Sequence, residues 1–162
     1  MSKDTLVAYF SVTGKTSKIA TLLASLVNAD VFEIKPVKPY EKDDLNWQDK
    51  SSRTSKEHDD PSFRPEIAKK IENFDHYKKI FIGFPIWWYT APRIINTFLD
   101  SYDFSNKTII TFATSGGTEI EKADNDLCEA CKNHGRWVKG KRFNEIEMDV
   151  INVMSWVDSL GL

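Results

Sequence analysis

Short apolar runs alternate with amphipathic stretches along most of this chain, which is the pattern of strands separated by helices. Residues 5–10, 79–83 and 108–113 form continuous apolar runs, as strands buried on both faces do. The run at 31–34 is weaker and partly alternating. Residues 136–143 resemble a short fifth strand whose Lys and Arg side chains suit a sheet edge. We therefore expect five strands.

Helices are expected between these strands and after the last of them. Apolar side chains recur every three to four residues over 19–27 and 94–102, and a more polar helical pattern covers 120–131. Asn144, with Glu147 three residues later, is typical of a helix start. It predicts a last helix whose apolar stripe consists of Ile146, Val150, Met154 and Val157. The alternation predicts an α/β fold in three layers, with a parallel sheet between helices, and residues 1–162 suit a single domain.

A long polar segment, residues 36–65, interrupts this alternation and has no helical or strand pattern. It includes Trp47, Arg53, His58 and Arg64. Loops of this length in a compact domain are usually functional or disordered. We expect an ordered excursion over the edge of the sheet.

A polar segment, Ser11–Thr16, follows the first strand and opens the first helix. Backbone N–H groups at a helix start lack intrahelical partners, and the helix dipole is positive there, so a phosphate fits this place. Gly14 lets the backbone approach closely, and the hydroxyls of Ser11, Thr13 and Thr16 can donate hydrogen bonds. The alternative is simple helix capping. A nucleotide-hydrolase loop is disfavoured, because Tyr9 occupies the position of its first glycine.

Two further segments follow the third and fourth strands. Residues 83–92 contain three consecutive aromatic residues, which cannot all point into a core, so at least one is expected to be exposed or to cover a ligand. The alternative is a hydrophobic hinge or a dimer patch. In Thr114–Thr118, paired glycines let the main chain approach a flat ligand and offer N–H donors. Because carboxyl ends of parallel strands share one sheet edge, the three segments are expected to lie together.

The three segments resemble the FMN-binding loops of flavodoxin-like proteins, above all the short-chain bacterial branch that carries Gly-x-Pro-Ile-Trp-Trp and Thr-Ser-Gly-Gly. The resemblance covers nearly the whole chain. It implies a three-layer flavodoxin-like sandwich with five parallel strands in the order 2-1-3-4-5, and FMN as the cofactor. The implied cofactor-binding residues are Ser11, Val12, Thr13, Gly14, Lys15, Thr16, Pro85, Ile86, Trp87, Trp88, Thr114, Ser115, Gly116 and Gly117. The first loop would hold the phosphate, residues 85–88 would lie along the flavin ring, and residues 115–117 would bind the pyrimidine edge or the ribityl chain.

Composition and charge exclude several other classes of protein. The formal net charge of −2 gives no electrostatic case for nucleic acid. No apolar run reaches the length of a membrane span, and the run that ends at Phe10 is too short for a signal peptide. The two cysteines, Cys128 and Cys131, favour a reducing cytoplasm. They form a CxxC pair inside a predicted helix, where we interpret them as reduced structural residues.

No catalytic side chain and no metal site are expected. The sequence shows no Ser-His-Asp set and no carboxylate pair, so hydrolysis is disfavoured. His58, His76 and His134 lie outside the three loops and are assigned surface roles. On helical spacing, His134 is poorly placed to join Cys128.

Two classes of function remain open, and so does the choice between a monomer and a homodimer. One is an electron carrier that docks on a redox partner protein. The other is an enzyme that reduces a small-molecule electron acceptor, such as an NAD(P)H-dependent flavin or quinone reductase. The mild charge disfavours a carrier, since carriers usually steer by a strongly acidic face. Trp47 and the excursion could roof a substrate pocket, which favours the enzyme.

The absence of glycine from residues 86–90 also bears on this choice. We expect this loop to avoid positive φ, the conformation that a peptide flip towards a reduced flavin requires. Little stabilisation of the one-electron-reduced flavin is therefore expected, and this favours two-electron chemistry.

Overall fold

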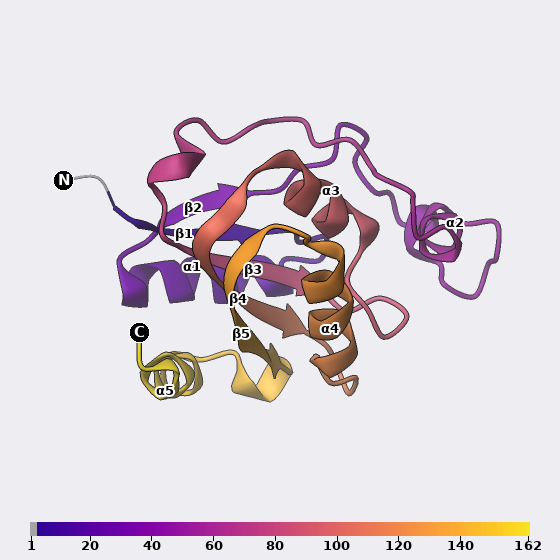
Figure 1. The fold of residues 1–162 in the computed structure, drawn as a ribbon. Coiled ribbons are helices and arrows are strands. Elements are labelled where there is room, and N and C mark those ends of the chain that lie inside the picture. Colours follow the sequence, from indigo (N-terminus) through magenta and orange to yellow (C-terminus); the bar gives the residue numbers. More distant parts are fainter. Residues whose placement is uncertain (1–2) are drawn as a thin grey trace.

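A central parallel sheet lies between two layers of helices in the computed structural model, which describes residues 3–162 (Figure 1). The strands are β1 (Thr5–Tyr9), β2 (Asp30–Glu33), β3 (Lys79–Pro85), β4 (Phe104–Thr114) and β5 (His134–Phe143). The α-helices are α1 (Lys15–Val27), α2 (Arg53–Asp59), α3 (Arg93–Ser101), α4 (Glu121–Ala130) and α5 (Val150–Leu160). The sheet order β2-β1-β3-β4-β5, parallel throughout, confirms the predicted fold. No helix in residues 3–162 has the length and apolarity needed to cross a membrane.

Side chains of each central strand alternate between two buried layers, which explains their continuous apolar runs. Leu6, Ile80 and Ile82 pack with helices α3 and α4 on one face of the sheet. Val7 and Phe81 pack with α1 and α5 on the other face. The sheet is thereby fixed between both layers, and the loops at its carboxyl edge have a rigid base.

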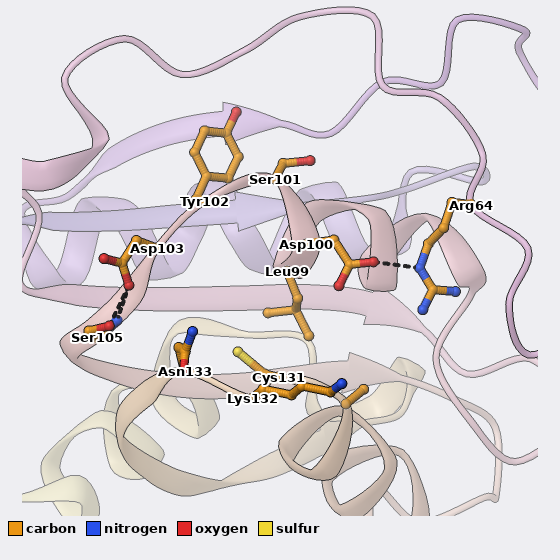
Figure 2. Close-up of a pocket in the computed structure, with 11 residues that line it drawn as sticks. Arg64, Leu99, Asp100, Ser101, Tyr102, Asp103, Ser105, Cys131, Lys132 and Asn133 are labelled. Carbon is orange, nitrogen blue, oxygen red and sulfur yellow. Dashed lines mark hydrogen bonds and ion pairs between the residues drawn. The ribbon is translucent and has the colours of Figure 1, made fainter.

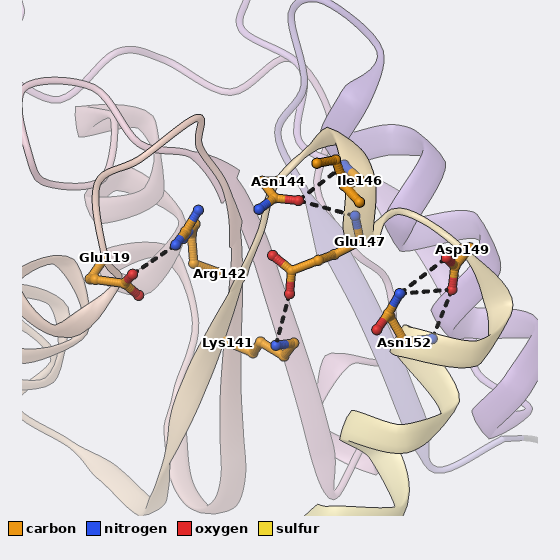
Figure 3. A network of polar contacts seen from close by, with 8 residues as sticks. All are labelled: Glu119, Lys141, Arg142, Asn144, Ile146, Glu147, Asp149 and Asn152. Carbon is orange, nitrogen blue, oxygen red and sulfur yellow. Dashed lines mark hydrogen bonds and ion pairs between the residues drawn. The ribbon is translucent and has the colours of Figure 1, made fainter.

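The start of the last helix differs from the prediction. Asn144 caps a short 3₁₀ helix, Glu145–Glu147, by accepting hydrogen bonds from the backbone N–H groups of Ile146 at 3.0 Å and Glu147 at 3.1 Å (Figure 3). Asp149 caps α5 itself, accepting from the Asn152 N–H at 2.8 Å.

The predicted apolar stripe of this helix is consequently wrong. Ile146 is 87% exposed and Val150 is 50% exposed, whereas Val153 and Trp156 form the buried face. The break between the 3₁₀ helix and α5 rotates the helical face, so a stripe counted from Asn144 no longer applies.

The long segment after β2 is ordered and lies beyond the carboxyl ends of the strands, where α2 projects to one side of the molecule (Figure 1). A bridge between Pro36 and Ile67 closes its base. Inside it, the buried carboxylate of Glu57 accepts hydrogen bonds from the Tyr40 hydroxyl and from Arg53 Nε, the latter at 2.9 Å. The Arg53 guanidinium lies 3.8 Å from the centre of the Tyr40 ring. Burial and this hydrogen bond raise the pKa of Tyr40 well above its usual range.

Candidate functional site

The loop between β1 and α1 presents backbone donors towards the carboxyl edge of the sheet. Gly14 is the N-cap of α1 with a φ of 93°, a conformation that favours glycine. Its N–H donates to Ser11 Oγ at 3.1 Å. The N–H groups of Thr13, Lys15 and Thr16 have no hydrogen-bond partner within residues 3–162. A Cβ at Gly14 would meet nothing within 4 Å, so there is open space beside Gly14. This donor set suits an anion such as a phosphate.

Two side chains of this loop make contacts with neighbouring loops. Thr16 is buried, and its hydroxyl lies 2.8 Å from the hydroxyl of Thr114 at the end of β4. Thr16 therefore connects the first loop to the third. Lys15 forms an exposed ion pair with Glu145 of the 3₁₀ helix. The Lys15 ammonium thus lies beside the free N–H groups of Thr13, Lys15 and Thr16, which we call the donor cradle.

The loop after β4 is a second set of donors. Ser115 Oγ accepts from the N–H groups of Gly117 at 3.3 Å and Thr118 at 2.9 Å, which curls the loop. The Ser115 N–H donates to the carbonyl of Phe143 at 3.2 Å. A Cβ at Gly116 or Gly117 would meet nothing within 4 Å, and neither residue has a positive φ. The protein itself therefore does not require glycine here, whereas a ligand lying flat against the backbone would.

The aromatic segment after β3 forms a tight turn. The N–H of Trp87 donates to the Thr90 carbonyl at 2.9 Å, and the Thr90 N–H donates back to Trp87 at 3.1 Å. The two central residues, Trp88 and Tyr89, have φ values of 47° and 66°. The expectation that this loop avoids positive φ is wrong. A side-chain bond from Thr90 to Asp126 of α4 at 2.7 Å holds the turn, a tertiary contact that no local pattern shows.

The three aromatic rings of this turn have different surroundings. Trp87 packs edge-on against Phe10 and Tyr40, with centroids 5.6 and 5.5 Å away. Trp88 stacks on His58 of α2 at 5.1 Å and an interplanar angle of 14°. Tyr89 is 66% exposed. His58 is therefore part of the site's support rather than a simple surface residue. Burial, followed by the charge of Arg93, lowers the pKa of His58, so the stacked ring is neutral at pH 7.

Two cavities flank these loops. The first, of about 380 Å³, lies beside the donor cradle and is lined by Thr13, Lys15, Pro85, Thr114, Ser115, Gly116, Phe143, Asn144, Glu145, Ile146 and Met148. The second, of about 420 Å³, lies over the aromatic turn and is lined by Leu45, Trp47, Thr54, Ile86, Trp87, Trp88, Tyr89 and Thr118. Nine of the fourteen predicted cofactor-binding residues line one cavity or the other. The remaining five, Ser11, Val12, Gly14, Thr16 and Gly117, shape the loops without lining either cavity.

Several residues of the site were not predicted from the sequence. Phe143 ends β5 and residues 144–148 follow it, so the rule that loops gather at the carboxyl edge could have identified them. Near them, Arg142 pairs with Glu119 at 2.7 Å and Lys141 with Glu147 at 3.3 Å (Figure 3). No sequence pattern marked Thr54 as a residue of the site, because its position depends on how the long segment 36–65 folds back towards the aromatic turn.

A further cavity, of about 630 Å³, lies away from these loops, beside the amino ends of β4 and β5 (Figure 2). It is lined by polar residues such as Asp100, which pairs with Arg64 at 2.7 Å, and by Cys131.

Burial raises the pKa of the Cys131 thiol to about 11, so it is protonated at pH 7. Both Cys128 and Cys131 are free thiols. Contrary to expectation, His134 does reach Cys128, with Nε2 3.5 Å from Sγ.

Comparison with known proteins agrees with this geometry. The chain is 44% identical to a candidate flavoprotein from Bacteroides uniformis, with a TM-score of 0.92 and coverage of 98% and 99% of the two chains. It is 40% identical to another from Bacteroides eggerthii, with a TM-score of 0.91 and 99% of each chain covered. A Lactobacillus acidophilus flavoprotein in complex with FMN shares the fold, at 23% identity, a TM-score of 0.74, and coverage of 99% and 100%. No curated protein matches the chain.

The sheet order and the loops gathered at its carboxyl edge define a flavodoxin-like α/β protein. The flavodoxin family model matches residues 4–160, and the chain belongs to this family. This membership supports the prediction that FMN is the cofactor.

Proposed function

We propose that this protein binds one FMN at the carboxyl edge of its sheet and transfers electrons through it. The observation that carries the proposal is the donor cradle of Thr13–Thr16, which lies on the same edge as the glycine loop of Ser115–Gly117. The cradle would hold the phosphate, and the glycine loop would hold the flavin edge or the ribityl chain. When bound, FMN supplies the redox chemistry, and the protein supplies orientation and hydrogen bonds.

A second candidate function is reduction of a small-molecule electron acceptor. It is favoured by Leu45, Trp47 and Thr54 of the long segment, which extend the wall of the cavity of about 420 Å³ beyond the loop residues assigned to the flavin. The backbone of the aromatic turn does not favour this function, because Trp88 and Tyr89 already have the positive φ values that a peptide flip towards a reduced flavin requires.

The first test is a titration of the cofactor-free protein with FMN and with riboflavin, followed by the quenching of flavin fluorescence. Charge-assisted hydrogen bonds contribute about 1.5–3 kcal/mol each, so losing two of them should weaken riboflavin binding by about 100-fold or more. Equal affinity for the two flavins would refute the cradle as the phosphate site.

A second test is anaerobic mixing of the FMN-loaded protein with NADH or NADPH. It separates the two functions, because the absorbance of the flavin should bleach only if the protein is the reductase.

Truncation of the two tryptophans should have contrasting effects. Trp87→Ala should lower the free energy of unfolding by about 2–4 kcal/mol, because Trp87 packs against Phe10 and Tyr40. Trp88→Ala should destabilise the protein less, since it mainly loses its stack on His58. We expect Trp88→Ala to raise the fluorescence of bound FMN, because stacked aromatic rings quench flavin emission. Unchanged emission in Trp88→Ala would show that this ring does not meet the flavin.

A further inference from the structure

The two cysteines of the CxxC motif lie at the opposite edge of the sheet from the cofactor loops. Cys128 is half-buried in the last turn of α4, and the buried Cys131 is the C-cap of that helix. Both lie close to His134, which begins β5, whereas Phe143, which lines the cavity beside the donor cradle, ends this strand. The strand is roughly 30 Å long, at about 3.3 Å per residue. The thiols are therefore remote from the proposed FMN site.

His134 provides a proton acceptor for Cys128. Its Nε2 lies 3.5 Å from Cys128 Sγ, within reach of a hydrogen bond to sulfur. The other ring nitrogen, Nδ1, lies 2.8 Å from the carbonyl oxygen of Gly135, which can only accept a hydrogen bond. Nδ1 therefore carries a proton, and in the neutral ring Nε2 presents its lone pair to the thiol. A thiol, a base within reach and a group that orients the base are the arrangement that activates a nucleophile.

The other surroundings of Cys128 oppose ionisation of its thiol. Burial raises the pKa of Cys128, and the nearby charges of Asp124 and Glu129 raise it further. The carboxyl end of α4 also carries the negative end of the helix dipole, which disfavours a thiolate. From β5, His134 is the titratable group that contacts the thiol. The reactivity of Cys128 at pH 7 therefore depends on transfer of its proton to His134.

Cys131 is placed to react with a sulfur atom that is bonded to Cys128. Side chains three residues apart on a helix have Cβ atoms about 5–6 Å apart, and a disulfide needs about 3.5–4.5 Å. The chain leaves the helix at Cys131, whose ψ is 88°. Cys131 also lines the cavity of about 630 Å³, so there is space beside its side chain (Figure 2). A disulfide between the two cysteines can therefore form by a shift of the last turn of α4.

The cavity beside Cys131 indicates which reagent the thiols would meet. Its wall includes the segment 130–133, which joins α4 to His134. It carries charges of both signs, with Arg64 and Lys132 against Asp100 and Asp103. Such a wall suits a small zwitterion with carboxylate and ammonium groups. Within residues 3–162, no group of three or more His, Cys, Asp or Glu side chains is arranged to hold a metal ion, so thiol chemistry suits this cluster better than metal binding.

We propose that Cys128 and Cys131 form a dithiol site that reduces a zwitterionic low-molecular-weight disulfide, with His134 as the proton acceptor of Cys128. Cys128 passes its proton to His134, and its sulfur attacks one sulfur of the disulfide. The S–S bond breaks, and the released thiolate takes the proton from His134.

The Cys131 sulfur then attacks Cys128 Sγ in the mixed disulfide and expels a second thiol, which takes up the Cys131 proton. Two protein thiols are thereby oxidised to one disulfide, and the small disulfide is reduced to two thiols. The proposal does not depend on FMN.

The test mixes reduced full-length protein with oxidised glutathione, stops the reaction with N-ethylmaleimide and measures the intact mass. We expect the unaltered protein to lose two hydrogens and to take up no label. Cys131→Ser should stop with one glutathione attached to Cys128, and Cys131→Ala gives the same readout if serine is not tolerated at this buried position. Cys128→Ser should react at least about tenfold more slowly, because burial raises the pKa of the remaining Cys131 thiol and His134 contacts Cys128 instead.

His134→Gln tests the proton acceptor, because glutamine can form a hydrogen bond but is not a base. The first step should be at least about tenfold slower at pH 7. Between about pH 7 and 9 its rate should rise about tenfold per pH unit, following the thiolate fraction of Cys128, and more steeply than in the unaltered protein. The matched control is His76→Gln, since the ring nitrogens of His76 contact backbone carbonyls of Asn73 and Lys3. This control should react as the unaltered protein does.

Three outcomes would overturn the proposal, provided that circular dichroism shows each variant to be folded. The first is that the unaltered protein forms no internal disulfide. The second is that Cys128→Ser reacts as fast as the unaltered protein, which would show that Cys128 is not the attacking thiol. The third is that His134→Gln keeps the rate and the pH profile of the unaltered protein, which would show that His134 does not accept the proton. FMN affinity should be the same in all variants, so a failure of FMN binding refutes the proposed function and leaves this site untouched.

Discussion

Gly14→Ala is expected to weaken FMN binding by at least about tenfold while leaving the protein folded. The φ of Gly14 is 93°, and a Cβ there costs about 1–2 kcal/mol, which the loop can relieve only by turning its N–H groups away. Each charge-assisted bond lost to the phosphate costs about 1.5–3 kcal/mol more. Riboflavin binding should change far less, because it makes no phosphate contact. The ratio of the FMN and riboflavin affinities is therefore the quantity to measure.

Gly161→Ala is the matched control for this variant. Gly161 has a φ of 65°, follows the last turn of α5, and has nothing within 4 Å of the Cβ position, as at Gly14. Both variants should lower the free energy of unfolding by a similar amount, about 1 kcal/mol. Only Gly14→Ala should change the preference for FMN over riboflavin. If both variants bind the two flavins as the unaltered protein does, the loop caps α1 and does not hold a phosphate.

The parts of this fold that the sequence could predict are those with local causes. Strands buried on both faces must be continuously apolar, as residues 79–83 and 108–113 are, so the sheet and its order followed from pattern and resemblance. The loop Ser11–Thr16 could be predicted for the same reason, because a helix start offers free donors whatever lies around it. Its turn is closed by a bond within the loop, from the Gly14 N–H to Ser11 Oγ, whereas its contacts to Thr114 and Glu145 have no local signal.

Features set by distant contacts could not be predicted in this way. The turn at Trp88 and Tyr89 depends on a bond between Thr90 and Asp126, which lie 36 residues apart. Propensity alone argues against positive φ there, and the tertiary contact prevails. The start of α5 shows a competition between two caps, Asn144 and Asp149, of which the first ends after a single 3₁₀ turn. Both predictions were wrong because each rested on one local signal. In the turn a tertiary contact prevails over propensity, and before α5 the Asp149 cap competes with the Asn144 cap.

The structure of the excursion, residues 36–65, depends more on tertiary contacts than any other part of the fold. The Glu57 carboxylate is at the centre of these contacts. Glu57→Ala should lower the free energy of unfolding by about 3 kcal/mol, because removing one member of a buried ion pair leaves the other charge uncompensated. Arg53 would lose its Nε partner, and the Tyr40 hydroxyl would lose its acceptor. Alanine is a good helix former, so the loss cannot be assigned to the propensity of α2.

The matched control is Asp100→Ala, which breaks the more exposed Arg64–Asp100 pair at the other cavity (Figure 2). Exposed ion pairs contribute about 0–1 kcal/mol, so this variant should change stability little. Chemical denaturation measures both variants, and limited trypsin digestion reports where the chain opens. Glu57→Ala should be cut first within residues 42–56, which contain Lys42, Lys50, Arg53 and Lys56. Equal stability of the two variants would show that the Glu57 network does not hold the excursion. The excursion would then be held by its other contacts, among them the stack of His58 on Trp88 and the bonds from Arg93 to the carbonyls of Glu57 and His58.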